Sequence, residues 1–322
     1  MRIGFRFSVF FMLLAVTGFA HAQTWPGKPV RVVVSQAPGT PPDIIARLLG
    51  ERLARGWGQQ VVIDNRAGGA NIIGAQAAAR SPADGYNYFF ATTAAVVTNI
   101  YAFKTLPYDP VRDFAPVAMI GMSPFLLVAN ASVPAKTLPE LVALAKSSSG
   151  KFAFASDGQR LLSGMMGDAL NLSAGMNALH VPYNASAPAL QDTIAGRTQF
   201  VLMGIPAVVP FVNRGQLRAI AVSSARRLPG MDNVPAIGET VPGFEFSGWF
   251  ALLAPAGTPA DIVQRVNRDL DKTLNEPEVS QRLREFGIYS DGAGTPQALA
   301  EFMSRERERW GKTMRAIGVE PE

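Results

Sequence analysis

The chain has 322 residues, of which 48% are hydrophobic and 17% charged, a composition typical of a folded globular protein rather than a disordered one. It contains no cysteine, which excludes disulfides, cysteine metal sites, thiol catalysis and a lipid-modified N-terminal cysteine. The net charge is +5, and the densest basic run, 305–309, alternates arginine with glutamate. That alternation is typical of a solvated helix face, so we expect no nucleic-acid partner.

The first 22 residues have the pattern of a secretory signal peptide. Arg2 and Arg6 form a positive region, 7–19 is apolar, and Ala20-His21-Ala22 is a small-x-small cleavage site. The uninterrupted apolar run is shorter than the ~20 residues that a membrane-spanning helix needs. We therefore expect cleavage after Ala22 and release into a periplasm. The remaining chain, of about 300 residues, is long enough for two domains.

The mature chain opens with alternating strands and helices. We expect strands over 30–35, 61–63 and 86–91, and helices over 41–56 and, after a glycine-rich turn, 68–79. Pro41 fits the first helical turn, because its missing N–H would be unpaired there in any case. The alternation favours parallel α/β units with right-handed crossovers.

A second α/β block and a helical C-terminal region follow. We expect strand-like runs over 114–128, interrupted by Pro124, and over 151–155, 180–181, 200–203, 217–222 and 249–253, with helices over 138–146, 161–172, 187–195, 259–274, 278–286 and 296–317. No linker is long or polar enough to separate independent domains. The sequence therefore predicts two Rossmann-like lobes around a central cleft, 23–123 plus 248–322 and 124–247, with hinges near 122–124 and 247–249.

Catalytic motifs are scarce. The mature chain has one histidine, His180, which a Ser-His-Asp triad would need, but no Gly-x-Ser-x-Gly elbow supplies a nucleophile. A lone histidine at a strand end is more often a structural hydrogen-bonding group. No Asp-x-Asp-x-Asp loop, Gly-x-Gly-x-x-Gly motif or Walker motif is present. We expect no catalytic residue, no metal and no cofactor.

Two loops, 37–43 and 181–188, each follow a predicted strand and open into a predicted helix. The first turn of a helix offers unpaired N–H groups and the positive end of the helix dipole, which suit an anion. Because the loops lie half a chain apart, they suggest a carboxylate held between two lobes. Loops after the other strands would join them at the carboxyl ends of the sheets, where open α/β folds bind ligands.

The candidate ligand-binding residues all lie in such loops. They are Ala37, Gly39, Thr40 and Pro41 in the first loop, Thr92 and Thr93 after 86–91, Ser156, Asp157 and Arg160 after 151–155, Asn184, Ala185, Ser186 and Ala187 in the second loop, and Gly204 after 200–203. Glycine permits close backbone approach, and Thr, Ser and Asn supply donors. The alternative is that these polar residues only cap helices.

Several ordered motifs resemble those of one family. They are Trp-Pro-x-Lys-Pro-Val-Arg at 25–31, the Pro-Gly loop ending in Asp-Ile-Ile-Ala-Arg at 43–47, Asp-Asn-Arg-Ala-Gly-Gly at 64–69, Leu-Pro-Tyr-Asp-Pro at 106–110, Val-Pro-Tyr through Ala-Gly at 181–196, and Trp through Pro-Ala-Gly-Thr-Pro at 249–259. Spread over the whole mature chain, they resemble the Bug or TctC family, the periplasmic solute-binding proteins of tripartite tricarboxylate transporters.

The resemblance implies a type II periplasmic-binding fold, which closes on its ligand like a Venus flytrap. It implies that the two loops grip one ligand carboxylate, often through ordered waters, and that a membrane permease with two integral subunits receives the ligand. Typical ligands are dicarboxylates, tricarboxylates, acidic amino acids and aromatic carboxylates, and we expect a monomer. The alternatives are an exported α/β hydrolase or transferase that uses His180, and a receptor for a two-component sensor.

The chain departs from the family pattern in the expected pocket loops. Thr40 replaces the second glycine of the first loop, Asn184-Ala185 replaces Lys-Gly, and Arg160-Leu-Leu-Ser-Gly replaces Gly-Ser-x-x-His. One hypothesis is that Arg160 holds a second, distal carboxylate; the alternative is a surface arginine. Because an ionised acid would repel a carboxylate, we expect Asp43 and Asp192 to be structural.

Overall fold

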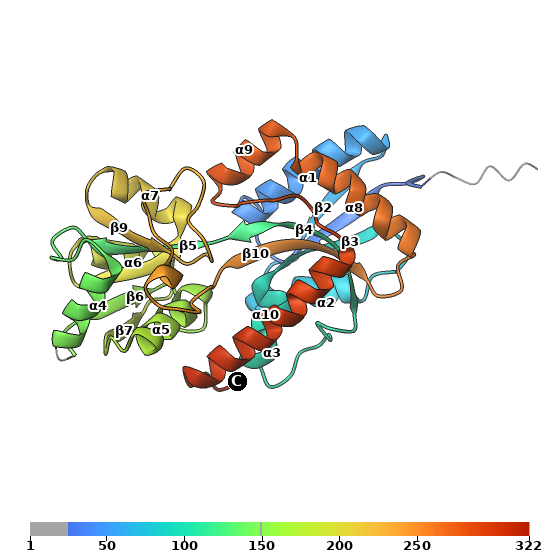
Figure 1. Ribbon diagram of the computed structural model, residues 1–322. Coiled ribbons are helices and arrows are strands. Elements are labelled where there is room, and N and C mark those ends of the chain that lie inside the picture. The colour runs from blue at the N-terminus through green and yellow to red at the C-terminus, as the bar shows by residue number, and fades with distance from the viewer. Residues whose placement is uncertain (1–24, 149, 322) are drawn as a thin grey trace, which may run out of the picture.

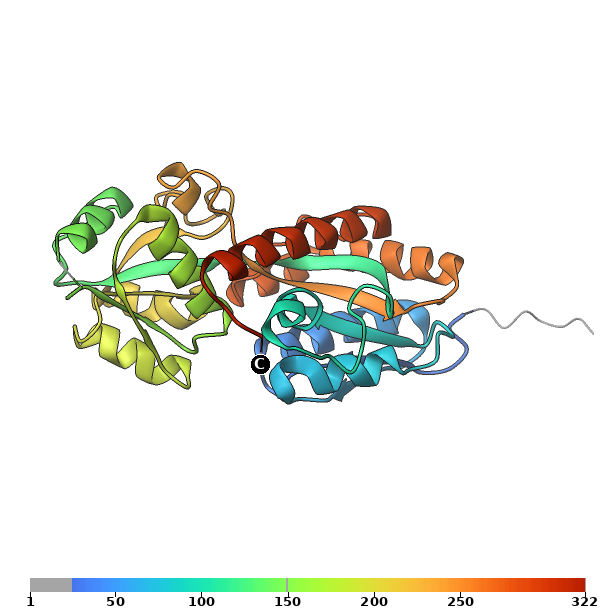
Figure 2. The same cartoon turned by 90° about the horizontal axis from the view of Figure 1, so that it is seen from below.

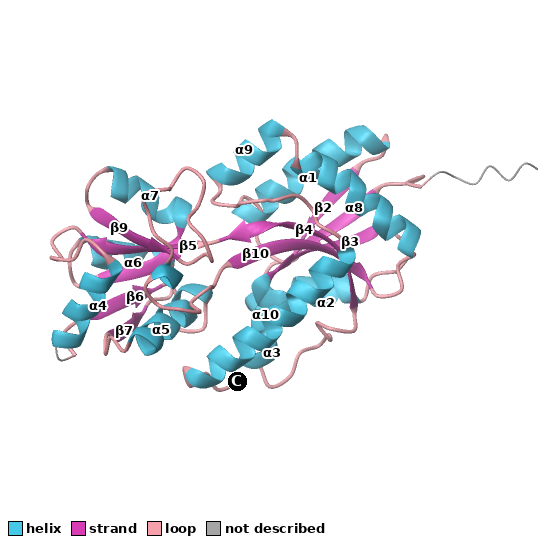
Figure 3. Cartoon of the chain, viewed as in Figure 1, coloured by secondary structure: helices cyan, strands magenta, loops and turns pink. Residues whose placement is uncertain are grey.

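The computed structural model describes residues 25–148 and 150–321, so the expected signal peptide and its cleavage site lie outside the described residues. Within these ranges the strands form two five-stranded sheets, each flanked by helices (Figures 1 and 3). The expected α/β class is thereby confirmed. No helix within the two described ranges is both long and apolar enough to span a membrane.

The two sheets have related layouts. The first has the order β2 (Val61–Asn65), β1 (Val30–Val34), β3 (Asn87–Thr92), β10 (Gly248–Pro255), β4 (Phe114–Ser123), and the second has the order β7 (Leu179–Pro182), β6 (Ala153–Ser156), β8 (Phe200–Gly204), β5 (Phe125–Asn130), β9 (Leu217–Val222). The pairs β1–β2, β1–β3, β6–β7 and β6–β8 are parallel, as the alternation predicts. By contrast, β10 and β5 run antiparallel to their neighbours.

Helices cover both faces of each sheet. They are α1 (Pro41–Trp57), α2 (Ile72–Ala79), α3 (Asn99–Ala102), α4 (Leu138–Ser147), α5 (Leu162–Ala174), α6 (Ser186–Ile194), α7 (Ile205–Asn213), α8 (Ala260–Leu274), α9 (Pro277–Glu285) and α10 (Pro296–Ala316). Helix α7 was not expected from the sequence. Its segment contains two prolines, one of them inside the helix at Pro210, and its apolar face packs on β5, β8 and β9. Tertiary packing therefore overrides a local helix-breaking signal.

The chain crosses between the sheets at two places (Figure 1). Strand β4 ends at Ser123 in the first sheet and β5 begins at Phe125 in the second, so only Pro124 separates them. The return path runs from Val222, at the end of β9, to Gly248, where β10 begins.

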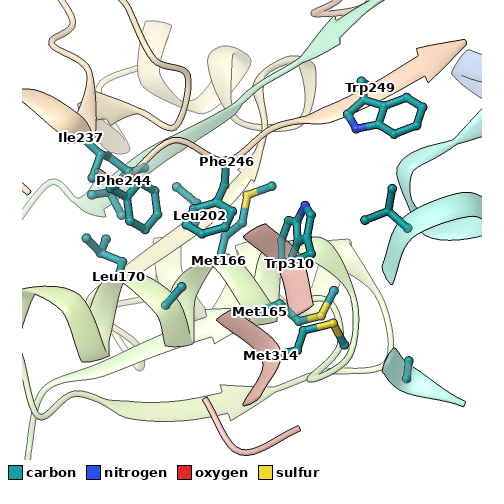
Figure 4. Close-up of a cluster of buried hydrophobic side chains, with 14 of the residues drawn as sticks. Met165, Met166, Leu170, Leu202, Ile237, Phe244, Phe246, Trp249, Trp310 and Met314 are labelled. Atoms are coloured by element: carbon teal, nitrogen blue, oxygen red, sulfur yellow. The ribbon is translucent and has the colours of Figure 1, made fainter. Parts of the chain in front are cut away.

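One buried cluster continues across both sheets. Helix α10 packs on β4 of the first sheet and also on α5, which covers the second (Figure 2). Trp310 of α10 is fully buried, and its ring centroid lies 4.9 Å from that of Phe246 in the returning segment. Met314 and Met165 belong to the same cluster (Figure 4). The last helix of the chain therefore completes the core of both halves.

A buried polar contact fixes α10 against β10. Glu306 of α10 is 1% exposed, and its carboxylate accepts a hydrogen bond of 3.2 Å from the indole N–H of Trp249. Arg309 forms an ion pair with the same carboxylate. A buried carboxylate needs such partners, because leaving one unpaired is costly. This contact therefore sets the position of Trp249, the second residue of β10.

Asp43 organises the loop between β1 and α1. Its carboxylate is 2% exposed and accepts hydrogen bonds from the Gly39 N–H (2.8 Å), the Asn65 amide (2.9 Å) and Arg47. Gly39 has a φ of 81°, which favours glycine at this turn. Burial alone would raise the pKa of Asp43, but the hydrogen bonds from Arg47, Gly39 and Asn65 together hold it below its ordinary value.

We expect Asp43→Asn to lower the free energy of unfolding at pH 7 by about 1–3 kcal/mol, because an amide N–H₂ would face the donors that the carboxylate now accepts from. Urea unfolding measures the loss, with the exposed Asp232→Asn as the control. A carboxylate whose pKa is lower in the folded chain stabilises the fold above its unfolded pKa of about 4, and this stabilisation is lost as the pH falls through the folded value. The wild type should therefore lose more stability below about pH 4 than the variant; parallel pH profiles would contradict this account.

The two buried tryptophans give a matched test of the Glu306 contact. Trp249→Phe and Trp310→Phe remove the same volume from nearly inaccessible sites, but only Trp249 donates to a buried carboxylate, while the Trp310 indole N–H has no hydrogen-bond partner among the described residues. We expect Trp249→Phe to cost about 1–3 kcal/mol more than Trp310→Phe in urea unfolding. Equal costs would show that the contact adds nothing to stability.

Candidate functional site

A cavity of about 370 Å³ lies where strands of the two sheets end. The first sheet contributes residues that follow β1 and β3, the second contributes the loop after β6, and β10 and the β4–β5 crossing complete the wall. Its lining comprises Gln36, Ala70, Asn71, Thr92, Thr93, Ala94, Thr98, Asn99, Ala102, Phe103, Ser123, Phe125, Asp157, Arg160, Leu161, Leu162, Ser163, Met165, Gly248, Trp249 and Phe250. This volume is within the usual range of small-molecule pockets.

Two other cavities are larger but differ in chemistry. One of about 650 Å³ lies between α10 and the segment 242–246, and one of about 570 Å³ is lined by arginines of both halves together with Tyr289. Neither is lined by residues that follow the parallel strands β1, β3 or β6. The 370 Å³ cavity has that position, where open α/β sheets bind ligands, and we take it as the candidate site.

Four of the residues singled out in the sequence line this cavity: Thr92, Thr93, Asp157 and Arg160. The other ten lie outside its lining: Ala37, Gly39, Thr40, Pro41, Ser156, Asn184, Ala185, Ser186, Ala187 and Gly204. Some of these ten are next to residues that line the cavity: Ala37 follows Gln36 in the chain, and Ser186 bonds to Asp157. The structure thus brings together the loops after β3 and β6 more closely than the two loops that were first singled out.

The two threonines hold the end of β3. Thr92 accepts a 3.3 Å hydrogen bond from the N–H of Ala95, as an N-cap side chain does. Thr93 accepts a 2.8 Å bond from the Trp249 N–H and donates to the carbonyl of the same residue at 3.4 Å. Thr93 is 1% exposed and therefore mainly joins β3 to β10, whereas the Thr92 hydroxyl keeps a proton that it can donate to a ligand.

The start of α1 has few donors left for an anion. The Gly39 N–H bonds to Asp43, and both the N–H and the hydroxyl of Thr40 bond to the carbonyl of Ala37, at 3.3 and 2.7 Å. The next two residues are prolines, which have no N–H. The positive end of the helix dipole remains, but its hydrogen-bonding groups are largely used within the protein.

The second loop meets the cavity through Asp157. Ser186 begins α6 and donates a 2.9 Å hydrogen bond to the Asp157 carboxylate, which also accepts a bond from the hydroxyl of Ser163. Asn184, Ala185 and Ala187 are exposed around the start of α6. Unlike α1, this helix has no proline in its first two positions. Ser186 and Ala187 therefore both carry a backbone N–H group that could bind an anion.

Ser156, His180 and Asp168 form a hydrogen-bonded chain that the motif search missed. The Ser156 hydroxyl lies 2.7 Å from Nε2 of His180, and Nδ1 of His180 lies 3.0 Å from Asp168. The ring also stacks on Phe154 at 4.4 Å. These are the elements of a Ser-His-Asp triad, but Ser156 is 0% exposed, so a substrate carbonyl has no access to its hydroxyl. The hydrogen bonds among Ser156, His180 and Asp168 therefore hold the loop after β6 in place, consistent with a structural histidine.

Arg160 and Gly204 occupy different surroundings. Arg160 is an exposed residue on the cavity wall and is engaged in an interaction within the chain. The turn that carries it packs closely on α5, where a Cβ at Gly164 would clash with the carbonyl oxygen of Gly158. Gly204 precedes the first turn of α7 and lies away from the cavity lining.

The two aspartates that we expected to be structural are paired within the protein. Asp43 holds the first loop, as described above, and Asp192 accepts a 2.5 Å bond from the Tyr183 hydroxyl and pairs with Arg197. The hydrogen bond from Arg197, with that from Tyr183, lowers the pKa of Asp192 below its ordinary value. Elsewhere, the part of the chain that the structure describes holds no group of three or more His, Asp or Glu side chains arranged to bind a metal ion.

Asn71 and its neighbours are site residues that the sequence reasoning did not select. Ala70 and Asn71 both have a positive φ, 51° and 76°, and the loop is fixed by a 2.8 Å bond from Asn99 to the carbonyl of Ala70. The Asn71 side-chain oxygen accepts from Ser35, so the N–H₂ group of this cavity-lining residue can still donate. The sequence signal was a Gly-Gly pair followed by Ala-Asn, since Asn tolerates the left-handed conformation.

Comparisons with known proteins find similarity over most of the chain. The model of the tripartite tricarboxylate transporter family receptor (TctC) matches residues 45–319. Protein BugT of Bordetella pertussis is 31% identical, covering 96% of both chains. An R. palustris protein solved with adipate has a TM-score of 0.79 at 33% identity, covering 92% of this chain and 100% of its own.

A further solved structure, MatC from Rhodopseudomonas palustris with bound malate, has a TM-score of 0.72 at 30% identity, covering 89% of this chain and 99% of its own. These likenesses extend over both sheets and confirm the two-lobed periplasmic-binding fold that the sequence motifs imply. The chain belongs to the tripartite tricarboxylate transporter receptor (TctC) family, which includes the Bug proteins.

Proposed function

We propose that this protein is a periplasmic receptor that binds a small organic carboxylate between two lobes and delivers it to a tripartite tricarboxylate-type permease. The observation that carries the proposal is the cavity at the strand ends, to which both sheets contribute residues. Support comes from two similar structures, which contain adipate and malate. In this proposal the receptor binds its ligand without changing it, and the inaccessible hydroxyl of Ser156 argues against hydrolysis by the Ser156–His180–Asp168 set.

The proposed lobes are 23–123 with 248–322, and 124–247, with hinges near 122–124 and 247–249. The two crossings between the sheets, at Pro124 and at the start of β10, support these boundaries. A ligand favours closure only to the extent that it binds the closed form more tightly. A ligand whose carboxylate contacts residues after β3 and whose body contacts residues after β6 satisfies this condition, since its contacts are shared between the lobes.

The ligand carboxylate lies on the first-sheet side of the cavity. There Gln36, Asn71 and Thr92 offer neutral donors, whereas Asp157, which follows β6 of the second sheet, would repel an anion. Hydrogen bonds from neutral donors to a carboxylate contribute on the order of 1.5–3 kcal/mol each. On closure, the exposed start of α6 with Asn184 and Ala187 approaches this side and adds the N-terminal N–H groups of a helix.

A thermal-shift screen with mono-, di-, tri- and aromatic carboxylates tests the proposed function. We expect at least one carboxylate to raise the melting temperature in a concentration-dependent way, because a ligand that binds only the folded state stabilises it. Mass spectrometry of the same samples should recover the ligand unchanged. Turnover of an ester or amide that is lost in His180→Ala would instead favour an exported hydrolase, and a sensor partner in place of the permease would appear in a pull-down with the isolated membrane components.

Asn71→Gly tests the position of the carboxylate. Glycine keeps the left-handed backbone but removes the amide donor, so we expect affinity for the identified carboxylate to fall at least about tenfold in calorimetry. Asn177→Gly is the matched control, since Asn177 also has a positive φ (56°) but lies away from the cavity. Equal affinities of the two variants would place the carboxylate elsewhere in the cleft.

A further inference from the structure

Leu161 is unfavourable for the stability of the protein in two ways. It occupies the N-cap position of α5, where it forms no side-chain cap and where Ser, Thr, Asp or Asn would satisfy a free N–H group. Its side chain is also 50% exposed. A leucine at this position therefore gains neither capping nor full burial while the cavity is empty. Within the chain the side chain packs over Gly158 in the preceding turn, and its exposed part lies on the cavity wall, where a ligand could cover it.

Leu161 is one of several apolar residues on the cavity wall. The same cavity wall also carries Phe103, Phe125, Leu162, Met165 and Phe250, drawn from both halves of the molecule. Trp249, which the Glu306 contact holds in place, adds a further ring. Asn71 and Thr92 supply polar donors, while most of the area of the cavity wall is apolar. Pockets of this kind suit ligands that are amphipathic along their length.

A second carboxylate on the ligand would meet two charged residues of opposite sign on the cavity wall. They are Asp157 and Arg160, and Arg160 already interacts within the chain. The Asp157 carboxylate is held in place by the hydroxyls of Ser163 and Ser186 and would repel a nearby anion. The cavity wall as a whole is thus close to neutral in formal charge and mainly apolar, unlike a site for a dicarboxylate or a tricarboxylate.

We propose that the ligand is a monocarboxylate whose apolar body is at least the size of a benzene ring, and that Leu161 determines this specificity by covering the body. This inference rests on the proposed receptor function and narrows the class of its ligand. The carboxylate binds among the donors of the first-sheet side, and the ring or chain extends toward the first turn of α5. Burial of the Leu161 side chain against that body supplies affinity that small hydroxy acids cannot obtain.

Calorimetry with 3-phenylpropionate, benzoate, malate and citrate tests this, using the wild type, Leu161→Ser and the control Leu172→Ser. Leu172 lies on the same helix and is 56% exposed, but it is not on the cavity wall. We expect the wild type to bind 3-phenylpropionate at least tenfold more tightly than malate or citrate. Leu161→Ser should weaken that binding about tenfold, because the buried apolar contact is lost, while its melting temperature stays equal or rises because serine caps α5. Leu172→Ser should bind like the wild type.

Each other outcome of these measurements refutes a specific part of the proposal. Tighter binding of malate or citrate than of 3-phenylpropionate refutes the apolar ligand class but leaves the receptor function intact. Unchanged affinity in Leu161→Ser, with a folded protein, refutes the role of that residue, and Leu161→Ala repeats the test without adding a cap. Binding of none of the carboxylates, here and in the broader thermal-shift screen, refutes the receptor function itself and the inference with it.

Discussion

The position of the cavity depends on the buried contact between Glu306 of α10 and Trp249 of β10. This carboxylate is almost inaccessible to solvent, and it is tolerated because an indole N–H and a guanidinium both donate to it. Trp249 in turn bonds through its backbone to Thr93 at the end of β3, so one connected set of bonds joins α10, β10 and β3. These bonds hold Thr93 and Trp249, which line the cavity, and the buried Glu306 carboxylate fixes one end of the set.

Helix starts that look equivalent in the sequence differ in what they can bind. Both α1 and α6 follow a parallel strand, and a dipole argument alone treats them alike. At α1, however, Asp43 and the carbonyl of Ala37 accept hydrogen bonds from the groups that an anion would use, and two prolines contribute no N–H. Whether a helix start binds a ligand therefore depends on the local competition for its donors, which the dipole does not describe.

Much of the fold could be predicted because its strands are apolar on both faces, as Val30–Val34 illustrates, and because proline and glycine mark the ends of α1. The antiparallel placement of β5 and β10 could not, since strand direction is decided by pairings between distant segments. For the site, position after a strand was enough to select Thr92 and Asp157. It was not enough for Asn71 or Leu161, whose roles depend on a backbone conformation and on an exposure that only the folded chain reveals.

Helix α10 has a consequence for the order in which the molecule can form. It is the last helix to be synthesised, yet it supplies Trp310 and Met314 to a cluster shared by both sheets (Figure 4). Neither half can complete its core on an unfinished chain, so a nascent polypeptide that lacks its last thirty or so residues stays short of the cooperative transition.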